Sequence, residues 1–77
     1  MTQHCDIELD LSGLTCPMPL LKAKQALNKM DSGRIVKVLA TDPASERDFK
    51  VFSDQSGIPL LSTEKIAGKF IYWLQKP

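Results

Sequence analysis

The chain has 77 residues, of which 43% are hydrophobic, and its ten basic and nine acidic side chains leave a net charge of +1 at pH 7. A domain of this size buries only roughly 60% of the surface that its unfolded chain exposes, so a large catalytic cavity is not expected. A near-neutral chain has no overall field that would attract nucleic acid or an anionic membrane. We therefore expect one domain over residues 1–77, with no direct contact with nucleic acid.

No apolar stretch approaches the ~20 residues that a membrane span requires. Residues 1–6, MTQHCD, lack the basic region followed by an apolar one that is typical of a targeting segment. We accordingly expect a cytoplasmic protein that makes no membrane contact and acts as a monomer.

The first predicted element is a strand at residues 6–11, where acidic and apolar side chains alternate strictly. Ile7, Leu9 and Leu11 form one face, and the acidic residues between them form the other. Because that acidic face must meet water, any helices are expected to pack against the opposite face of the sheet.

The second predicted element is a helix that starts near Cys16 and is ended by residues 31–33. Its apolar side chains recur at spacings of three and four, at Leu20, Ala23, Leu27 and Met30. Two prolines at its start are compatible with a helix, because the first four helical N–H groups have no partner within the helix. Gly33 is the expected left-handed cap at its end.

A second strand is predicted at residues 35–40, and a second helix follows it and runs to about residue 56. Asp42 is the expected N-cap of this helix, ahead of a proline at the first helical position. Phe49 and Phe52 are expected on its buried face, and Gly57 is expected to end it.

Two more strands are predicted at residues 58–66 and 69–76, joined by a close turn at Ala67 and Gly68. A right-handed crossover makes the first two strands parallel, and the hairpin adds an antiparallel member. The predicted fold class is therefore α/β, of the α+β type: a two-layer sandwich with a four-stranded mixed sheet and both helices on one face.

The last strand is apolar on both faces, unlike the first. Lys69 and Gln75 share a face with Ile71 and Trp73, which places this apolar pair outward. Two interpretations remain open, namely an exposed aromatic that serves a protein contact and local packing on the sheet.

The two cysteines, Cys5 and Cys16, lie near opposite ends of the first predicted strand. At ~3.3 Å per residue the strand separates them by roughly 20 Å, whereas the Cα atoms of a disulfide lie within about 7 Å. Both thiols are therefore expected to be free, and Cys5 is interpreted as a bystander near the terminus. With a single histidine the chain falls short of a four-ligand zinc site, so no metal is predicted.

Cys16 lies in the run GLTCPMP at residues 13–19, at the predicted start of the first helix. Free N–H groups and the positive end of the helix dipole stabilise a thiolate there, so the pKa of the thiol is expected to be lowered. The proline after the cysteine fixes the direction of the chain and presents the sulfur at the surface. The alternative is a small buried hydrophobic residue.

Residues 11–20, LSGLTCPMPL, resemble the signature of the TusA (SirA/YedF-like) sulfur-carrier family, in which Gly-Leu-x-Cys-Pro-x-Pro includes a CPxP motif. Residues 40–49, ATDPASERDF, resemble the family's Asp-Pro run, which opens the second helix and has an acidic residue about a turn and a half later. The length and the order of elements agree as well, so the resemblance covers nearly the whole chain.

The resemblance implies that Cys16 accepts sulfane sulfur as a persulfide from a cysteine desulfurase or a rhodanese and passes it to a downstream acceptor protein. The pathways it implies are tRNA thiolation, molybdenum-cofactor supply and sulfur oxidation. The residues expected to support the cysteine are Gly13, Pro17 and Pro19. Candidates for partner recognition are Met18, Asp42 and Asp48. An N-cap remains the alternative role for Asp42, and an ordinary solvated side chain remains the alternative for Asp48.

The predicted chemistry needs no cofactor and no general base: a thiolate attacks the terminal sulfur of a donor persulfide, and an acceptor thiol later attacks the outer sulfur on the carrier. Such a protein is a sulfurtransferase-type co-substrate as much as an enzyme. The absence of a Cys-x-x-Cys pair counts against a dithiol oxidoreductase. A haem-responsive Cys-Pro module lacks an evident second axial ligand, and an RNA-binding domain lacks a basic stripe with stacking aromatics.

Overall fold

A computed structural model describes residues 4–77. Residues 1–3, on which part of the expectation about a targeting segment depends, lie outside the described residues. The described helices and strands are β1 (Ile7–Asp10), α1 (Met18–Asn28), β2 (Ile35–Ala40), α2 (Ala44–Ser56), β3 (Leu60–Ile66) and β4 (Lys69–Gln75). This is the predicted order of elements.

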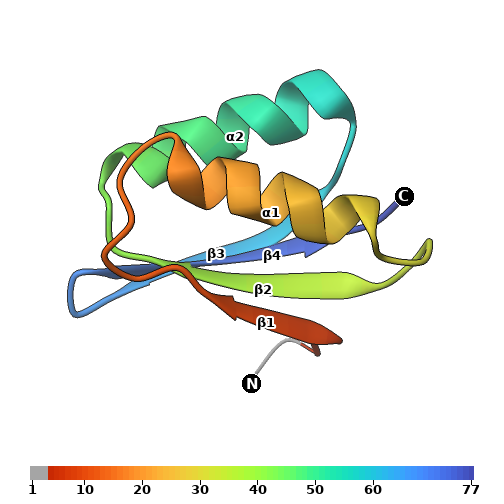
Figure 1. Cartoon of the computed structure of the whole chain (residues 1–77), viewed down its shortest axis with the longest axis horizontal. Helices are drawn as coiled ribbons and strands as arrows, with labels where there is room; N and C mark the ends of the chain where they lie inside the picture. Colours follow the sequence, from red (N-terminus) through yellow and green to blue (C-terminus); the bar gives the residue numbers. More distant parts are fainter. Residues whose placement is uncertain (1–3) are drawn as a thin grey trace.

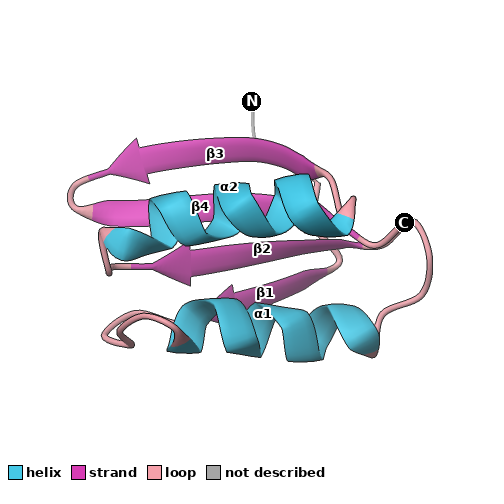
Figure 2. Ribbon diagram, turned by 90° about the horizontal axis from the view of Figure 1, so that it is seen from above, coloured by secondary structure: helices cyan, strands magenta, loops and turns pink. Residues whose placement is uncertain are grey.

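The four strands form one mixed sheet in the order β1-β2-β4-β3. β1 pairs with β2 in parallel, and β4 pairs with both β2 and β3 in antiparallel fashion. Both helices lie on the same side of the sheet, as predicted (Figure 1). Seen from above, α2 lies on the side of β3 and β4, and α1 lies on the side of β1 (Figure 2). The predicted two-layer architecture is therefore confirmed.

The core lies between the sheet and the two helices. The alternation in β2 buries Val36, Val38 and Ala40 completely on the helix side. Helix α1 contributes Ala23 and Leu27 of the predicted stripe, with Leu20 at the edge, and Met30 is buried just beyond the end of the helix. Phe49 of α2 is fully buried as well. From β4 the core receives Phe70, Tyr72 and Leu74. The apolar spacings in the sequence thus correspond directly to the interior.

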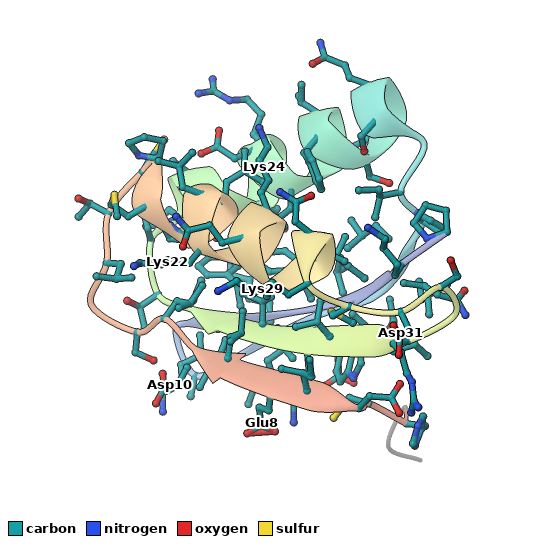
Figure 3. The ribbon with its side chains drawn as sticks, turned by 45° about the vertical axis from the view of Figure 1, so that its right-hand side comes forward. Glu8, Asp10, Lys22, Lys24, Lys29 and Asp31 are labelled. Carbon is teal, nitrogen blue, oxygen red and sulfur yellow. The ribbon has the colours of Figure 1, made fainter. Side chains whose placement is uncertain are left out.

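The opposite face of the sheet is polar along β1, where Glu8 and Asp10 point away from the helices (Figure 3). Trp73 also belongs to this face, because its neighbours Tyr72 and Leu74 face the core. The predicted outward placement is confirmed, but of the two interpretations left open the exposed aromatic is excluded, since only 2% of Trp73 is accessible. Its register partner on β2, Lys37, lies across it, with Nζ 5.7 Å from the centre of the indole ring. Local packing on the sheet is thus the correct interpretation.

Two glycine positions show where local sequence signals hold and where they fail. Gly57 ends α2 in the left-handed conformation, as predicted, with φ at +77°. Gly33 is left-handed too, but it does not cap α1, which ends at Asn28. The last turn of α1 is closed instead by the N–H groups of residues 29 and 30, which bond three residues back. Gly33 shapes the later turn into β2, where its N–H donates to the Lys76 carbonyl at 2.7 Å.

The hairpin turn is where it was predicted, because Ala67 and Gly68 both have positive φ, the requirement of a tight two-residue hairpin loop. Strand β3, by contrast, begins two residues later than predicted. Pro59 has no N–H to donate to a ladder, and the N–H of Ile58 bonds to the Ser56 hydroxyl at 3.1 Å.

Candidate functional site

The candidate site forms where the loop between β1 and α1 meets the loop between β2 and α2. Gly13, in the first loop, has a φ of +83°, which glycine adopts at little cost. Its N–H donates to the Thr41 hydroxyl in the second loop at 2.9 Å. This contact joins two segments that lie 28 residues apart in the chain.

Cys16 is exposed, as predicted, and it is held by two carboxylates. Its backbone N–H donates to Asp42 Oδ2 at 2.6 Å. Its thiol donates to Asp48 Oδ2 at 2.8 Å. The peptide bond from Cys16 to Pro17 is cis. The structure thus brings together Cys16, Asp42 and Asp48, which the sequence separates by up to 32 residues.

The expected lowering of the Cys16 pKa is wrong. The hydrogen bond to Asp48, partial desolvation, and the negative charges of Asp48 and Asp42 raise the pKa of the Cys16 thiol above its usual value, and Arg47 opposes them. Cys16 also precedes the helix, since α1 begins at Met18. The two carboxylates that α2 and its preceding loop place beside Cys16 outweigh any effect of the dipole of α1.

Asp42 is not the N-cap of α2. The N-cap is Pro43, and the first helical residue is Ala44. The prediction put the proline at the first helical position, and it lies one residue before that position. Asp42 nevertheless serves the start of the helix, because its Oδ1 accepts the N–H of Ala44 at 3.2 Å. Its other carboxylate oxygen is the one that accepts the N–H of Cys16. One side chain therefore supports both the helix start and the cysteine loop.

The position of Asp48 depends on how α2 is anchored to the sheet. The Ser45 hydroxyl and the Tyr72 hydroxyl form a buried hydrogen bond of 2.7 Å. The ring of Phe49 stacks on that of Tyr72 with centroids 4.5 Å apart. Sequence reasoning missed Ser45 and Tyr72 as residues that shape the site. A signal for Ser45 existed, because it lies four residues before Phe49 on the apolar stripe of the helix.

The other predicted site residues surround the cysteine loop. Pro17 is the N-cap of α1 and Pro19 lies in its first turn, as expected of prolines at a helix start. Met18 lies between them and is 38% exposed. A groove of about 250 Å³ runs between the two helices, and its lining residues are Leu20, Lys24, Arg47, Asp48, Val51, Phe52 and Gln55. Asp48 therefore belongs both to the groove and to the sulfur site.

Neither cysteine forms a disulfide, and Cys5 lies before β1, at the opposite end of that strand from Cys16. Among residues 4–77, no three or more His, Cys, Asp or Glu side chains gather in a way that could hold a metal ion. Within the same range, each helix is too short or too polar to cross a membrane.

Fold and site together define a small two-layer α/β domain that presents one cysteine on the loop ahead of its first helix. The comparisons with known proteins agree with this class. Residues 7–76 match the family model described as "Sulfurtransferase TusA", and the chain belongs to the TusA family.

Several relatives in this family are similar over nearly their full length. The chain is 48% identical to a protein of Allochromatium vinosum named "Sulfur carrier protein TusA", over 92% of this chain and 93% of that protein. It is 39% identical to a protein of the same name from Pseudomonas putida, over 92% of this chain and 89% of the relative. A crystal structure of a SirA-like protein from Desulfitobacterium hafniense superimposes with a TM-score of 0.79 at 27% identity, covering 91% of this chain and 96% of the other.

Proposed function

We propose that this chain carries sulfane sulfur as a persulfide on Cys16, accepting it from a cysteine desulfurase or a rhodanese and delivering it to a downstream acceptor protein. The observation that carries the proposal is the exposed Cys16 thiol, fixed by hydrogen bonds to its N–H and its sulfur. The names of the relatives in A. vinosum and P. putida, which call them sulfur carriers, support the same role.

The chemistry requires a sulfur atom that two successive partner proteins can reach. Exposure of Cys16 provides this access. A carrier must also lack a neighbouring thiol that would expel the sulfur by forming a disulfide. Cys5 meets this condition, because β1 separates it from Cys16. The exposed Met18 and the groove beside Asp48 are the surfaces that we assign to partner recognition.

The proposal includes a monomeric carrier in the cytoplasm, where thiols are kept reduced. The pathways we consider are tRNA thiolation, molybdenum-cofactor supply and sulfur oxidation. Each of them would use the same persulfide, and the identity of the acceptor protein distinguishes them.

Mass spectrometry after incubation with a cysteine desulfurase and cysteine tests the proposal. We expect the chain to gain the mass of one sulfur atom on Cys16, and we expect dithiothreitol to remove it. Cys5→Ser should gain the same mass, whereas Cys16→Ser should not. A rhodanese with thiosulfate provides the second donor. Absence of the gain with both donors, or its persistence in Cys16→Ser, would overturn the proposal.

A further inference from the structure

Within residues 4–77, the Cys16 sulfur has one hydrogen-bond partner, which is Asp48. The 2.8 Å between Sγ and Oδ2 is within the range in which a carboxylate can exchange a proton with the group it contacts. The proton of the thiol therefore already points at the atom that could receive it.

Both partners in this contact are held in place. Cys16 is fixed through its backbone by Asp42. Asp48 lies one turn along α2 from Ser45, whose buried bond to Tyr72 anchors the helix on the sheet. A general base requires this kind of fixed geometry, because an unanchored carboxylate would seldom be aligned with the sulfur.

We propose that Asp48 takes the proton of Cys16 when sulfur is loaded and gives a proton to Cys16 when sulfur is delivered. The inference rests on the proposed persulfide transfer and adds a second reacting residue to it. It replaces the expectation that the transfer needs no general base.

In the loading step, the proton of Cys16 moves to Asp48, and Sγ attacks the terminal sulfur of the donor persulfide. The S–S bond of the donor breaks, and the donor cysteine leaves as a thiolate with the electron pair. The proton then passes from Asp48 to that thiolate. A thiol and a persulfide have become a persulfide on Cys16 and a donor thiol, with no net oxidation.

In the delivery step, an acceptor thiol gives its proton to Asp48, and its sulfur attacks the outer sulfur on Cys16. The S–S bond of the carrier breaks, Cys16 leaves as a thiolate, and the proton passes from Asp48 to the Cys16 sulfur. The acceptor now bears the persulfide, and the carrier has returned to its thiol. One carboxylate serves both half-reactions.

The titratable and charged groups around the sulfur come from the loop before α2, from both helices and from the sheet. Asp48, Asp42 and Arg47 act on the thiol directly. Lys24 of α1 lines the groove together with Asp48, and Tyr72 of β4 is influenced by Asp48 and Asp42. The carboxylates favour the neutral thiol, and Arg47 opposes them. In the free carrier the proton therefore stays on the sulfur.

The first test measures the pH dependence of Cys16 alkylation by iodoacetamide in the free protein, in a Cys5→Ser background. Asp48→Asn removes the negative charge with little change of shape, so its alkylation midpoint should move to lower pH. Asp54→Asn, in the same helix, is the matched control and should leave the midpoint in place. A midpoint in Asp48→Asn that equals the wild-type value would overturn the proposal.

The second test measures the rate of sulfur loading on Cys16 at saturating cysteine desulfurase and cysteine. Asp48→Asn should load about tenfold more slowly although its thiol is more acidic, and Asp48→Glu should recover part of the rate. If Asp48 served only the structure of the site, Asp48→Asn would not make the Cys16 thiol more acidic and slow its loading at the same time. Loading by Asp48→Asn at or above the wild-type rate would overturn the proposal.

A measurement on the Cys5→Ser protein needs no change at Asp48. Its S–H stretching band in the Raman spectrum reports Cys16 alone and should lie at the lower frequency of a hydrogen-bonded thiol. The frequency of a free thiol would overturn the proposal. These results remain distinct from a failure of the carrier function, in which the wild-type protein itself gains no sulfur.

Discussion

Ser45 of α2 and Tyr72 of β4 are joined by a hydrogen bond of 2.7 Å between their hydroxyl groups, and both residues are at most 1% exposed. This contact fixes the rotation of α2 on the sheet. Because Asp48 lies three residues after Ser45, it also determines where a carboxylate meets the Cys16 sulfur. The same buried hydrogen bond therefore contributes to the stability of the fold and to the geometry of the site.

Tyr72→Phe should lower the free energy of unfolding by about 1 kcal/mol, because the buried Ser45 hydroxyl loses its partner. Urea denaturation followed by circular dichroism measures this change. The double variant with Ser45→Ala should cost less than the sum of the two single changes. Simple additivity would show that the two hydroxyls do not interact.

Alkaline pH should destabilise the protein through the same tyrosine. Burial, with smaller contributions from nearby carboxylates, raises the pKa of Tyr72 above its usual value, although the Ser45 bond opposes the shift. The folded state therefore holds this proton more tightly than the unfolded state does. The resulting stability is complete below the unfolded pKa of about 10, and it is lost as the pH rises through the higher folded value. Unfolding free energies across this window should fall less in Tyr72→Phe than in the wild type, and equal slopes would contradict the assignment.

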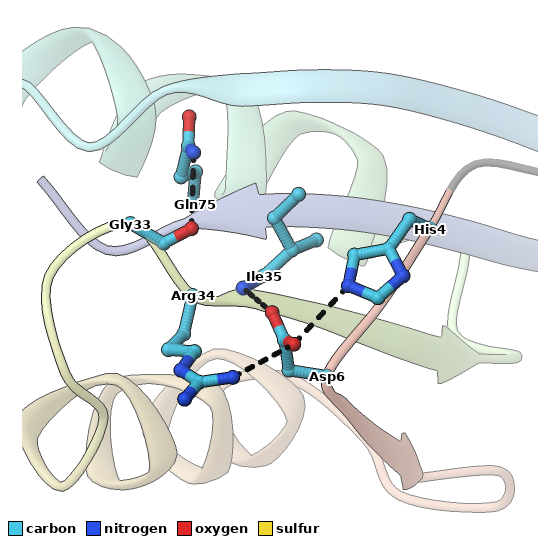
Figure 4. Close-up of polar contacts among 6 residues, drawn as sticks. All are labelled: His4, Asp6, Gly33, Arg34, Ile35 and Gln75. Atoms are coloured by element: carbon cyan, nitrogen blue, oxygen red, sulfur yellow. Dashed lines mark hydrogen bonds and ion pairs between the residues drawn. The ribbon is translucent and has the colours of Figure 1, made fainter.

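Asp6 should make the protein sensitive to acid. Its carboxylate accepts the backbone N–H of Ile35 at 2.8 Å and contacts His4 and Arg34 (Figure 4). The bond from Ile35 has the largest effect and lowers the pKa of Asp6; desolvation opposes it, and the bonds from His4 and Arg34 lower the pKa further. The associated stability is present above the unfolded pKa and is lost as the pH falls through the lower folded value.

Asp6→Asn should therefore show a flatter acid limb when the free energy of unfolding is measured from neutral pH downward. Asp31→Asn, an exposed aspartate in the turn after α1, provides the control and should retain the wild-type slope. An acid limb in Asp6→Asn that is as steep as that of the wild type would assign the acid sensitivity to other carboxylates.

Asp42→Ala should destabilise the protein by about 0.5 to 2 kcal/mol, the range measured when a helix start loses its side-chain acceptor. The change removes the partners of the Ala44 and Cys16 N–H groups together. Hydrogen exchange should therefore become faster at the Cys16 amide, while the amides of β2 keep their protection relative to global unfolding. Unchanged exchange at Cys16 would show that the bond to Asp42 does not hold the cysteine loop.

Lys37→Ala should expose the only tryptophan of the chain. The Lys37 side chain covers Trp73 on the face of the sheet away from the helices, with 23% of its own surface accessible. We expect a red shift of the Trp73 fluorescence and stronger quenching by acrylamide. Lys37→Met should keep the tryptophan covered and lose the cation–π contribution of about 0.5 to 1 kcal/mol, together with the surface ion pair to Glu8, which adds little. A spectrum unchanged in Lys37→Ala would mean that other side chains cover the indole.

Local patterns in the sequence were sufficient for most of the fold. Alternation in β2 and the three-and-four spacing in α1 report burial directly, because each depends on the geometry of one element. The same reasoning placed Trp73 on the correct face of the sheet but left its burial open, because that burial depends on Lys37 of a neighbouring strand. It failed for Gly33, since a left-handed glycine can shape any turn and does not identify the helix end.

The sequence by itself was sufficient to propose Cys16 as the sulfur-carrying residue and to predict that its thiol is free and presented on a loop, because the surrounding glycine and prolines act locally on the backbone. The family to which the chain belongs follows from the same residues. Only the tertiary structure decided the protonation of that thiol. Two carboxylates from distant segments lie beside the sulfur, and electrostatic effects depend on distances in space that no local pattern encodes.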